Sequence, residues 1–214
     1  MFIPGCCILC LCVCLPLFRY NKKKDLKLAV CFKVLGTLCS FMLVLVAAIR
    51  LDHLSWLCAA ALFLFAIADA LLEYNWVWGG TFFALGHFCM IIWSLSKYTV
   101  SVTHLICCFV LLLALAFLFW HFRSGVNRKM MIPVMLYGTI LSVMAGCCIA
   151  GGLSPEAFNS SGWLMTAGGG LFFISDCLIL IRTAEGAKAP SWLDTAVMIT
   201  YYCALLCIGS SCLL

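Results

Sequence analysis

Charged residues are scarce in this chain: 10% of its 214 residues are Asp, Glu, Lys or Arg, whereas a soluble domain carries about 25%. Hydrophobic residues make up 66%. The polar segments are short, so no tail or loop is long enough to form a separate soluble domain. This composition excludes a water-soluble protein, and we predict one transmembrane domain that occupies residues 1–214.

The hydrophobic residues are arranged in long apolar runs. A helix needs about 20 apolar residues to cross a bilayer, and polar residues divide the chain into eight such runs. We therefore predict an all-α polytopic membrane protein with transmembrane helices at 2–18, 28–49, 54–73, 77–95, 100–122, 131–151, 162–181 and 192–213. The first run lacks the basic residues that begin a secretory signal peptide, so we expect it to be a retained span.

The formal net charge of +5 reflects topology and indicates no nucleic-acid partner. Ten of the 13 Lys and Arg residues lie in segments 19–27, 123–130 and 182–191, which share one side of the membrane if eight helices alternate. Cytoplasmic loops are enriched in Lys and Arg, so we expect both termini to be lumenal or extracellular. We expect the endoplasmic reticulum membrane, with the plasma membrane as the alternative.

Several familiar motifs are missing from the sequence. The 17 cysteines include no recurring CxxC pair with histidines at zinc-site spacing. The glycine run 168–170 lies in an apolar stretch with no Lys-Ser/Thr after it, so it is no phosphate-binding loop. The chain also contains no Gly-x-Ser-x-Gly nucleophile motif. We accordingly expect no metal and no cofactor.

Two aspartates stand inside apolar runs in nearly the same context. Asp69 lies in Leu-Phe-Ala-Ile-Ala-Asp-Ala-Leu and Asp176 in Leu-Phe-Phe-Ile-Ser-Asp-Cys-Leu, half the chain length apart. A carboxylate in a span costs about 2.5–3.5 kcal/mol on insertion scales, and such residues usually mark functional sites. The similarity predicts two parallel four-helix repeats; chance likeness between apolar segments is the alternative.

The predicted topology places other ionisable residues at the same depth as these acids. At 1.5 Å per residue, Asp69 and Asp176 lie about 6–8 Å inside the cytoplasmic ends of their helices, and Lys33 enters its helix to a similar depth. Glu73 is one turn from Asp69 on the same face. His87 either lies near Asp69 or is a packing residue bonded to a backbone carbonyl. We predict a shared polar pocket that opens toward the cytoplasm.

These residues, with their neighbours, give the sequence a family resemblance. It resembles the YhhN family of eight-span membrane proteins at Lys33, Ala68-Asp69-Ala70-Leu71-Leu72, Gly79, Phe83, His87, Gly168, Leu171-Phe172-Phe173-Ile174-Ser175-Asp176 and Thr200-Tyr201-Tyr202. Ala68, Met90 and Leu205 depart from the family pattern, where a glycine, a tyrosine and a glutamine are usual.

The resemblance implies an activity, because animal members of this family include lysoplasmalogenases. These enzymes cleave the vinyl-ether bond of a lysoplasmalogen to a fatty aldehyde and glycerophosphoethanolamine or glycerophosphocholine. Asp69 and Asp176 would then be catalytic carboxyl groups that share one proton. The expected partners are the lysophospholipid substrate and membrane lipid.

The resemblance also implies supporting roles for other residues. Lys33 would hold one aspartate ionised or contact the substrate phosphate. His87 and Tyr201 would position water or the hemiacetal. The spacing of Glu73 from Asp69, rather than the resemblance, makes it either the cytoplasmic rim of the site or a solvated helix end. Ser175 is counted as supporting, although adjacent helical residues diverge by about 100°, which argues against a Ser–Asp catalytic pair.

Two other functions fit part of the pattern. Parallel repeats with ionisable residues inside spans are also typical of transporters, including proton-coupled carriers of small molecules or lipids. A non-catalytic membrane scaffold is the other alternative, because the family's helix-8 glutamine is replaced by Leu205. Detergent-solubilised turnover distinguishes an enzyme from a transporter, which needs a sealed compartment.

Overall fold

The computed structural model describes residues 2–157 and 160–214, and within them it contains helices and no strand. The first span consists of α1 (Phe2–Ile8), a π-helical segment η1 (Leu9–Cys14) and α2 (Leu15–Asn21). The other spans are formed by α3 (Leu26–Arg50), α4 (Ser55–Leu72), α5 (Trp76–Lys97), α6 (Val102–Phe122), α7 (Met131–Gly152), α8 (Ser160–Glu185) and α9 (Ser191–Ser211). Short 3-10 turns lie at η2 (Arg123–Gly125), η3 (Arg128–Met130), η4 (Pro155–Ala157) and η5 (Gly186–Lys188).

The lengths of these helices confirm the predicted fold class. Eight helices in the described part of the chain are long and apolar enough to cross a membrane, and each overlaps one predicted run. The protein is therefore an all-α, integral multi-pass membrane protein. The two parallel repeats stay a prediction.

Side-chain caps explain where two of the site helices begin. The carboxylate of Asp25 accepts a hydrogen bond from the backbone N–H of Leu28 at the start of α3. The side-chain oxygen of Asn75 accepts from the N–H groups of Val77 and Trp78 at the start of α5. Such caps satisfy N–H groups that have no partner within the helix. The turn before α5 is only three residues long, so α4 and α5 are adjacent antiparallel helices.

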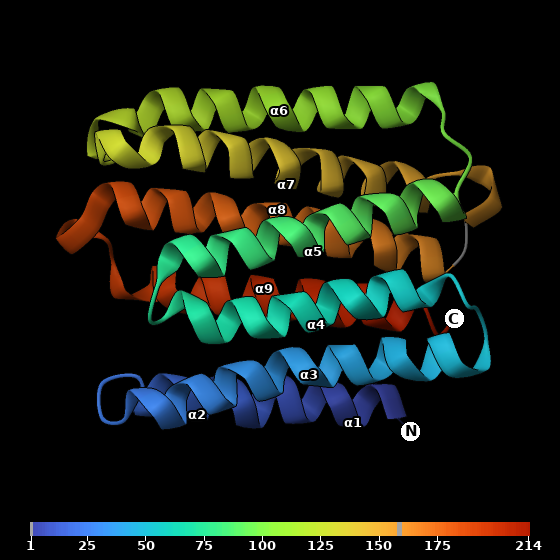
Figure 1. Cartoon of the computed structure of the whole chain (residues 1–214), viewed down its shortest axis with the longest axis horizontal. Coiled ribbons are helices and arrows are strands. Elements are labelled where there is room, and N and C mark those ends of the chain that lie inside the picture. Colours follow the sequence, from blue (N-terminus) through green and yellow to red (C-terminus); the bar gives the residue numbers. More distant parts are fainter. Residues whose placement is uncertain (1, 158–159) are drawn as a thin grey trace.

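The helices run side by side along the long axis of the molecule (Figure 1). The first span and α3 lie at one edge, and α6 lies at the other. Between them, α4 packs against α3 and α5, and α8 packs against α7 and α9. Two further contacts, α3 with α9 and α5 with α7, close the centre of the bundle. The helices that carry the two aspartates, α4 and α8, are therefore central.

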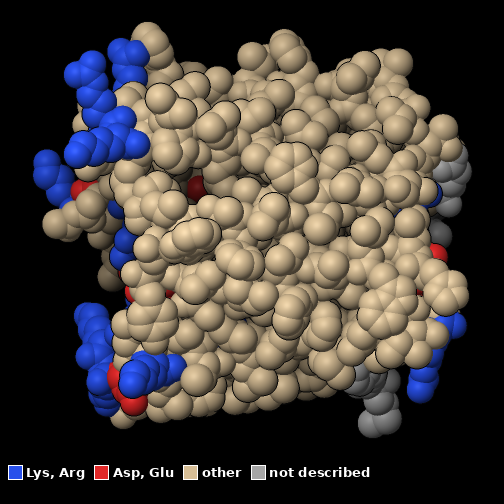
Figure 2. Space-filling view, viewed as in Figure 1, with Lys and Arg blue, Asp and Glu red and all other residues tan. Residues whose placement is uncertain are grey.

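The distribution of charge matches the alternating topology. Figure 2 shows most Lys and Arg side chains at one end of the molecule, beside a broad belt of uncharged side chains. Both chain ends lie at the opposite end (Figure 1). The basic loops therefore share one side, which we call the basic end. That this end faces the cytoplasm follows from the positive-inside rule and stays a prediction.

Glycine allows α8 to lie close to both of its neighbours. A Cβ on Gly168 would lie 2.7 Å from Cγ1 of Ile208 on α9, and a Cβ on Gly169 would lie 2.8 Å from Cβ of Cys148 on α7. Small residues permit such close helix contact in membranes. The helix continues through this glycine run without a break, so Asp176 is held on a regular, closely packed helix.

Candidate functional site

Asp69 lies at the centre of a cluster of polar side chains. It is only 1% exposed, and its Oδ2 accepts hydrogen bonds from Thr37 Oγ1 at 2.5 Å and from Tyr201 Oη at 2.8 Å. Its Oδ1 lies 3.5 Å from Nζ of Lys33. Lys33 and Thr37 lie on α3, and Tyr201 lies on α9. Helix α3 packs against both α9 and α4, the helix that carries Asp69. The cation and the two hydroxyl donors favour the charged form of this carboxylate, whereas its burial opposes that form.

Lys33 connects this cluster to the basic end. Its Nζ lies 3.0 Å from Oε1 of Glu73, while Lys33 itself is only 5% exposed. Burial raises the pKa of Glu73, but the positive charges of Lys33 and Lys22 outweigh burial and leave the pKa below its usual value. Glu73 is therefore ionised at neutral pH. We call Lys33, Thr37, Asp69, Glu73 and Tyr201 the Asp69 cluster.

Asp176 has different partners. Its Oδ2 accepts a hydrogen bond of 2.6 Å from Tyr137 Oη on α7, and Tyr137 Oη lies 3.1 Å from Nε2 of His87 on α5. His87 is fully buried, and its Nδ1 has no hydrogen-bond partner. No ion pair to Asp176 is present among the described residues, in contrast to Asp69. We call His87, Tyr137 and Asp176 the Asp176 cluster.

An aromatic side chain lies next to both clusters. The ring centroid of Phe172, on α8, is 5.0 Å from that of His87 and 5.5 Å from that of Tyr201. Phe65, on α4, is 5.3 Å from Phe172 and 5.1 Å from His87. The two polar clusters therefore adjoin the same pair of fully buried aromatic side chains.

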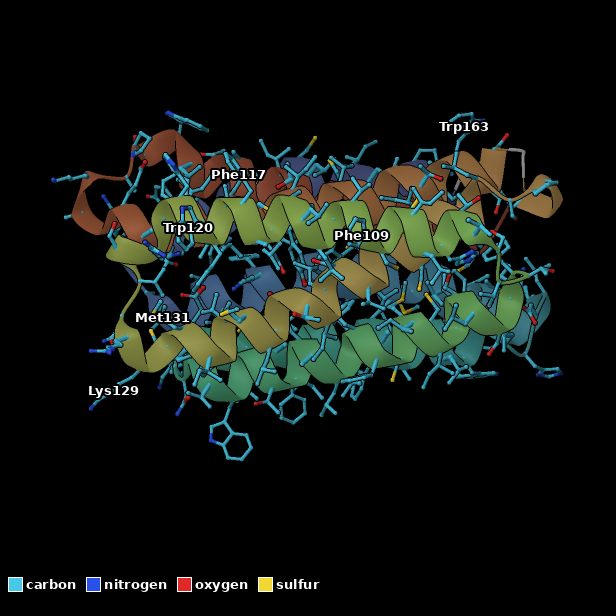
Figure 3. The ribbon with its side chains drawn as sticks, turned by 90° about the horizontal axis from the view of Figure 1, so that it is seen from above. Phe109, Phe117, Trp120, Lys129, Met131 and Trp163 are labelled. Carbon is cyan, nitrogen blue, oxygen red and sulfur yellow. The ribbon has the colours of Figure 1, made fainter. Side chains whose placement is uncertain are left out.

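The Asp176 cluster is the more accessible of the two. Asp176 and Tyr137 are both half-buried, and Figure 2 shows acidic atoms at the floor of a small hollow in the apolar belt, toward the basic end. At this end α6 and α7 lie apart, with Phe117 and Trp120 on one side and Met131 on the other (Figure 3).

The structure brings most of the predicted site residues together, in two groups. Lys33, Glu73 and Tyr201 join Asp69, and His87 belongs with Asp176. No hydrogen bond joins the two carboxyl groups in the described residues, so the expected direct pair that shares one proton is not formed. Each aspartate instead accepts from its own tyrosine.

Ser175 contacts neither cluster among the described residues, and its supporting role stays a prediction. Its Oγ donates to the backbone carbonyl of Val197 on α9 at 3.1 Å, so it fastens α8 to α9. Consecutive helical positions point about 100° apart, which turns Ser175 away from the partners of Asp176.

Two residues of the clusters were not predicted from the sequence. Thr37 follows Lys33 by four residues and so shares its helical face, a signal that was present in the spacing. For Tyr137, the sequence shows only a tyrosine within an apolar run, and nothing in its spacing indicates that it contacts Asp176. Of the family departures, Met90 contacts the thiol of Cys58 and Leu205 is buried, and neither belongs to a cluster.

The combined arrangement can hold and move protons. It contains two carboxyl groups in different surroundings, the phenols of Tyr137 and Tyr201, and the imidazole of His87, whose Nδ1 has no hydrogen-bond partner among the described residues. No group of three or more His, Cys, Asp or Glu residues that could hold a metal ion is present in the described part of the chain.

Comparisons with known proteins give one result. Neither the curated proteins nor the solved structures include a match to this chain. The model of the YhhN family matches residues 7–212, which is nearly the whole sequence and includes every residue of both clusters. The chain therefore belongs to the YhhN family.

Proposed function

We propose that this protein is a membrane hydrolase that cleaves the vinyl-ether bond of lysoplasmalogens. One observation carries the proposal: two aspartates lie within the spans of one bundle, near the same buried aromatic side chain, and among the described residues only Asp69 has a cation. Hydrolysis of a vinyl ether needs one proton donor and one anion, so two carboxyl groups in unlike surroundings match the reaction.

The reaction begins with protonation of the β-carbon of the vinyl ether. This leaves an oxocarbenium ion, to which water adds with loss of a proton, giving a hemiacetal. The hemiacetal then breaks its bond to the glycerol oxygen, which takes a proton and leaves. The products are a fatty aldehyde and the glycerophospho-base. An enzyme accelerates this sequence by positioning the proton donor and by stabilising the cation.

Asp176 is the better candidate for the proton donor. It has a single neutral hydrogen-bond donor, Tyr137, and no cation, so little favours its charged form. Asp69 has Lys33, Thr37 and Tyr201, all of which favour its charged form. Asp69 would therefore stabilise the oxocarbenium ion and orient water. Glycoside hydrolases divide two carboxyl groups in a related way, although their fold is unrelated.

His87 and Tyr137 complete the proton route in this scheme. After Asp176 gives its proton to carbon, its carboxylate accepts a proton from the attacking water and is restored. The free Nδ1 of His87 can bind the hemiacetal hydroxyl, while Nε2 contacts Tyr137. The hemiacetal proton then passes to the departing glycerol oxygen within the same cluster.

The membrane setting follows from the same proposal. The positive-inside rule would place the basic end in the cytoplasm and both termini in the lumen or outside the cell, with the endoplasmic reticulum as the expected membrane. Lysoplasmalogen would enter from the surrounding lipid, with its headgroup at the basic end and its chain between helices.

The test is aldehyde release by the purified protein in detergent micelles. Lysoplasmalogen should give fatty aldehyde, whereas a 1-acyl lysophospholipid should give none. Asp69→Asn and Asp176→Asn should each abolish release while leaving expression and elution from size exclusion intact. Full activity in either variant, or no aldehyde from the wild type, would refute the proposal.

The transporter remains the second candidate, and the same preparation tests it. Transport would require proteoliposomes and would show no turnover in micelles. Discontinuous helices at corresponding positions are typical of many transporters, whereas α4 and α8 are both continuous. This observation favours the hydrolase.

A further inference from the structure

The turn between α2 and α3 has the highest density of positive charge in the chain. Segment 19–27 contains one acid, Asp25, and five basic residues: Arg19, Lys22, Lys23, Lys24 and Lys27. The other two loops at the basic end are less dense, with three basic residues in segment 123–130 and two in segment 182–191. The positive-inside rule requires basic residues on one side of the membrane, but it does not require five of them in one turn.

The charges of segment 19–27 are exposed and unpaired. All five basic side chains are exposed, and none of them forms an ion pair within the part of the chain that the structure describes. The one acid of the segment is engaged elsewhere, because the Asp25 carboxylate accepts a hydrogen bond from the backbone N–H of Leu28 and caps α3. By contrast, Arg182 in the third basic loop is paired with Asp194. Segment 19–27 therefore presents its positive charge to the surroundings.

Aromatic rings of α2 hold two of these cations close to the end of the span. Lys24 Nζ lies 3.6 Å from the ring centroid of Tyr20, and Lys22 Nζ lies 5.2 Å from that of Phe18. A cation over an aromatic face is attracted to it. Tyr20 is 63% exposed, and tyrosines at the ends of membrane helices lie at the level of the lipid headgroups. The ammonium group of Lys24 is therefore held at this level.

The shortness of the turn keeps the remaining charges beside the bilayer as well. Helix α2 ends at Asn21 and α3 begins at Leu26, so residues 22–25 form the whole connection between two spans. Figure 2 shows Lys and Arg side chains at the corner where Figure 1 places this turn. Clusters of four to eight Lys and Arg residues directly beside a transmembrane helix are typical of segments that bind anionic lipid.

We propose that segment 19–27 binds anionic phospholipids of the leaflet at the basic end, by attraction to the phosphate and carboxylate groups of their headgroups. The partner is a lipid surface, because the cations are spread along an exposed turn between two spans. This inference goes beyond the proposed hydrolase and is independent of it, since the segment contributes no residue to either acid cluster.

The experiment measures lipid association with the full-length protein reconstituted in phosphatidylcholine vesicles. Trace amounts of spin-labelled phosphatidylserine or phosphatidylcholine are added, and electron paramagnetic resonance gives the association constant of each label at the protein surface. The wild type should prefer phosphatidylserine about fivefold at low ionic strength, which is the factor expected for one charge contact with an anionic lipid. Raising the salt from about 20 mM to about 0.5 M should remove most of this preference, because exposed charges are screened.

The triple variant Lys23→Gln/Lys24→Gln/Lys27→Gln should lower the preference for phosphatidylserine to less than half of the wild-type value. Lys22 is left in place because its charge also affects Glu73. The triple variant Lys23→Arg/Lys24→Arg/Lys27→Arg keeps the charge and should keep the preference. Each glutamine substitution made singly should cause part of the loss, so the comparison holds even if the triple variant fails to elute like the wild type in size exclusion.

The matched control removes the same charge from the other basic turn. Arg123→Gln/Arg128→Gln/Lys129→Gln takes three positive charges from segment 123–130 on the same side of the protein, and it should retain most of the preference.

Two kinds of result would overturn the proposal. A wild type without preference for phosphatidylserine at low salt would show that the segment binds no anionic lipid. An equal loss in the two glutamine triple variants would assign the preference to net charge rather than to segment 19–27. Aldehyde release is not part of this measurement, so neither result bears on the hydrolase.

Discussion

Replacing Tyr137 with phenylalanine removes the one hydrogen bond that the side chain of Asp176 receives among the described residues. The bond is 2.6 Å long and is made to a carboxyl group that would become charged on giving up its proton, and hydrogen bonds to charged groups contribute about 1.5–3 kcal/mol. If Asp176 is the proton donor, the misplaced carboxyl group should lower kcat/KM by about tenfold to 100-fold, since each 1.4 kcal/mol is a factor of ten.

Tyr201→Phe provides the comparison, because it deletes the corresponding hydroxyl beside the other acid. Asp69 keeps Thr37 and Lys33 after this change, so the loss should be that of one hydrogen bond among several, about 0.5–1.5 kcal/mol, or up to roughly tenfold. The structure thus predicts an order of effect, with Tyr137→Phe the more damaging of two chemically identical substitutions.

The assay is aldehyde release in mixed micelles at fixed mole fractions of lysoplasmalogen. Tyr98→Phe is the control for removing a buried phenol, because Tyr98 follows α5 at the end opposite to the basic loops. Melting in detergent should differ little between Tyr137→Phe and Tyr98→Phe. Wild-type activity in Tyr137→Phe, or a larger loss in Tyr201→Phe than in Tyr137→Phe, would refute the assignment of Asp176 as the donor.

Three further predictions concern the chemistry and the charges of the site. In D2O, the fatty aldehyde should carry one deuterium at carbon 2, detected by mass spectrometry, because the first step protonates that carbon; unlabelled aldehyde would exclude the mechanism. Lys33→Met should destabilise the protein by about 3–5 kcal/mol, since it leaves buried acids without a cation, and adding Asp69→Asn should restore melting temperature but not activity. The pKa of Glu73 is lowered in the folded protein. Its ionised side chain therefore stabilises the fold at pH values above its unfolded pKa of about 4.3, and this stabilisation is lost as the pH falls through the lower folded pKa. Glu73→Gln should therefore weaken the acid dependence of melting below about pH 5, and an unchanged dependence would count against the Lys33 contact.

The eight spans were predictable because membrane helices are specified by the length of their apolar runs. The polar turns that separate them, such as residues 22–25 and 73–75, were equally visible in the sequence. The positions of Lys33 and Glu73 followed from depth and from one-turn spacing, which are local properties of a helix. Local periodicity therefore accounts for the part of the site that is formed by α3 and α4.

The pairing of acids with tyrosines could not be predicted in the same way. Tyr201 and Asp69 are separated by 132 residues, and Tyr137 and Asp176 by 39. In a membrane every helix is apolar on most faces, so periodicity does not reveal which helices are neighbours. The direct contact expected between the two aspartates assumed that similar residues meet each other.

The helices that supply the hydrogen-bond partners of Asp69 and Asp176 can be compared with the predicted four-helix repeats. Asp69 belongs to the first half of the chain and receives its phenol from α9, the last helix of the second half. Asp176 belongs to the second half, and its tyrosine contacts His87 on α5, the last helix of the first half. The packing of α3 with α9 and of α5 with α7 follows the same exchange. Two parallel repeats around an axis along the membrane normal would produce this reciprocal arrangement. On that view one ancestral carboxyl site would have become two, and the cation that the described residues give to the Asp69 cluster alone would let one acid stay charged while the other gives up its proton.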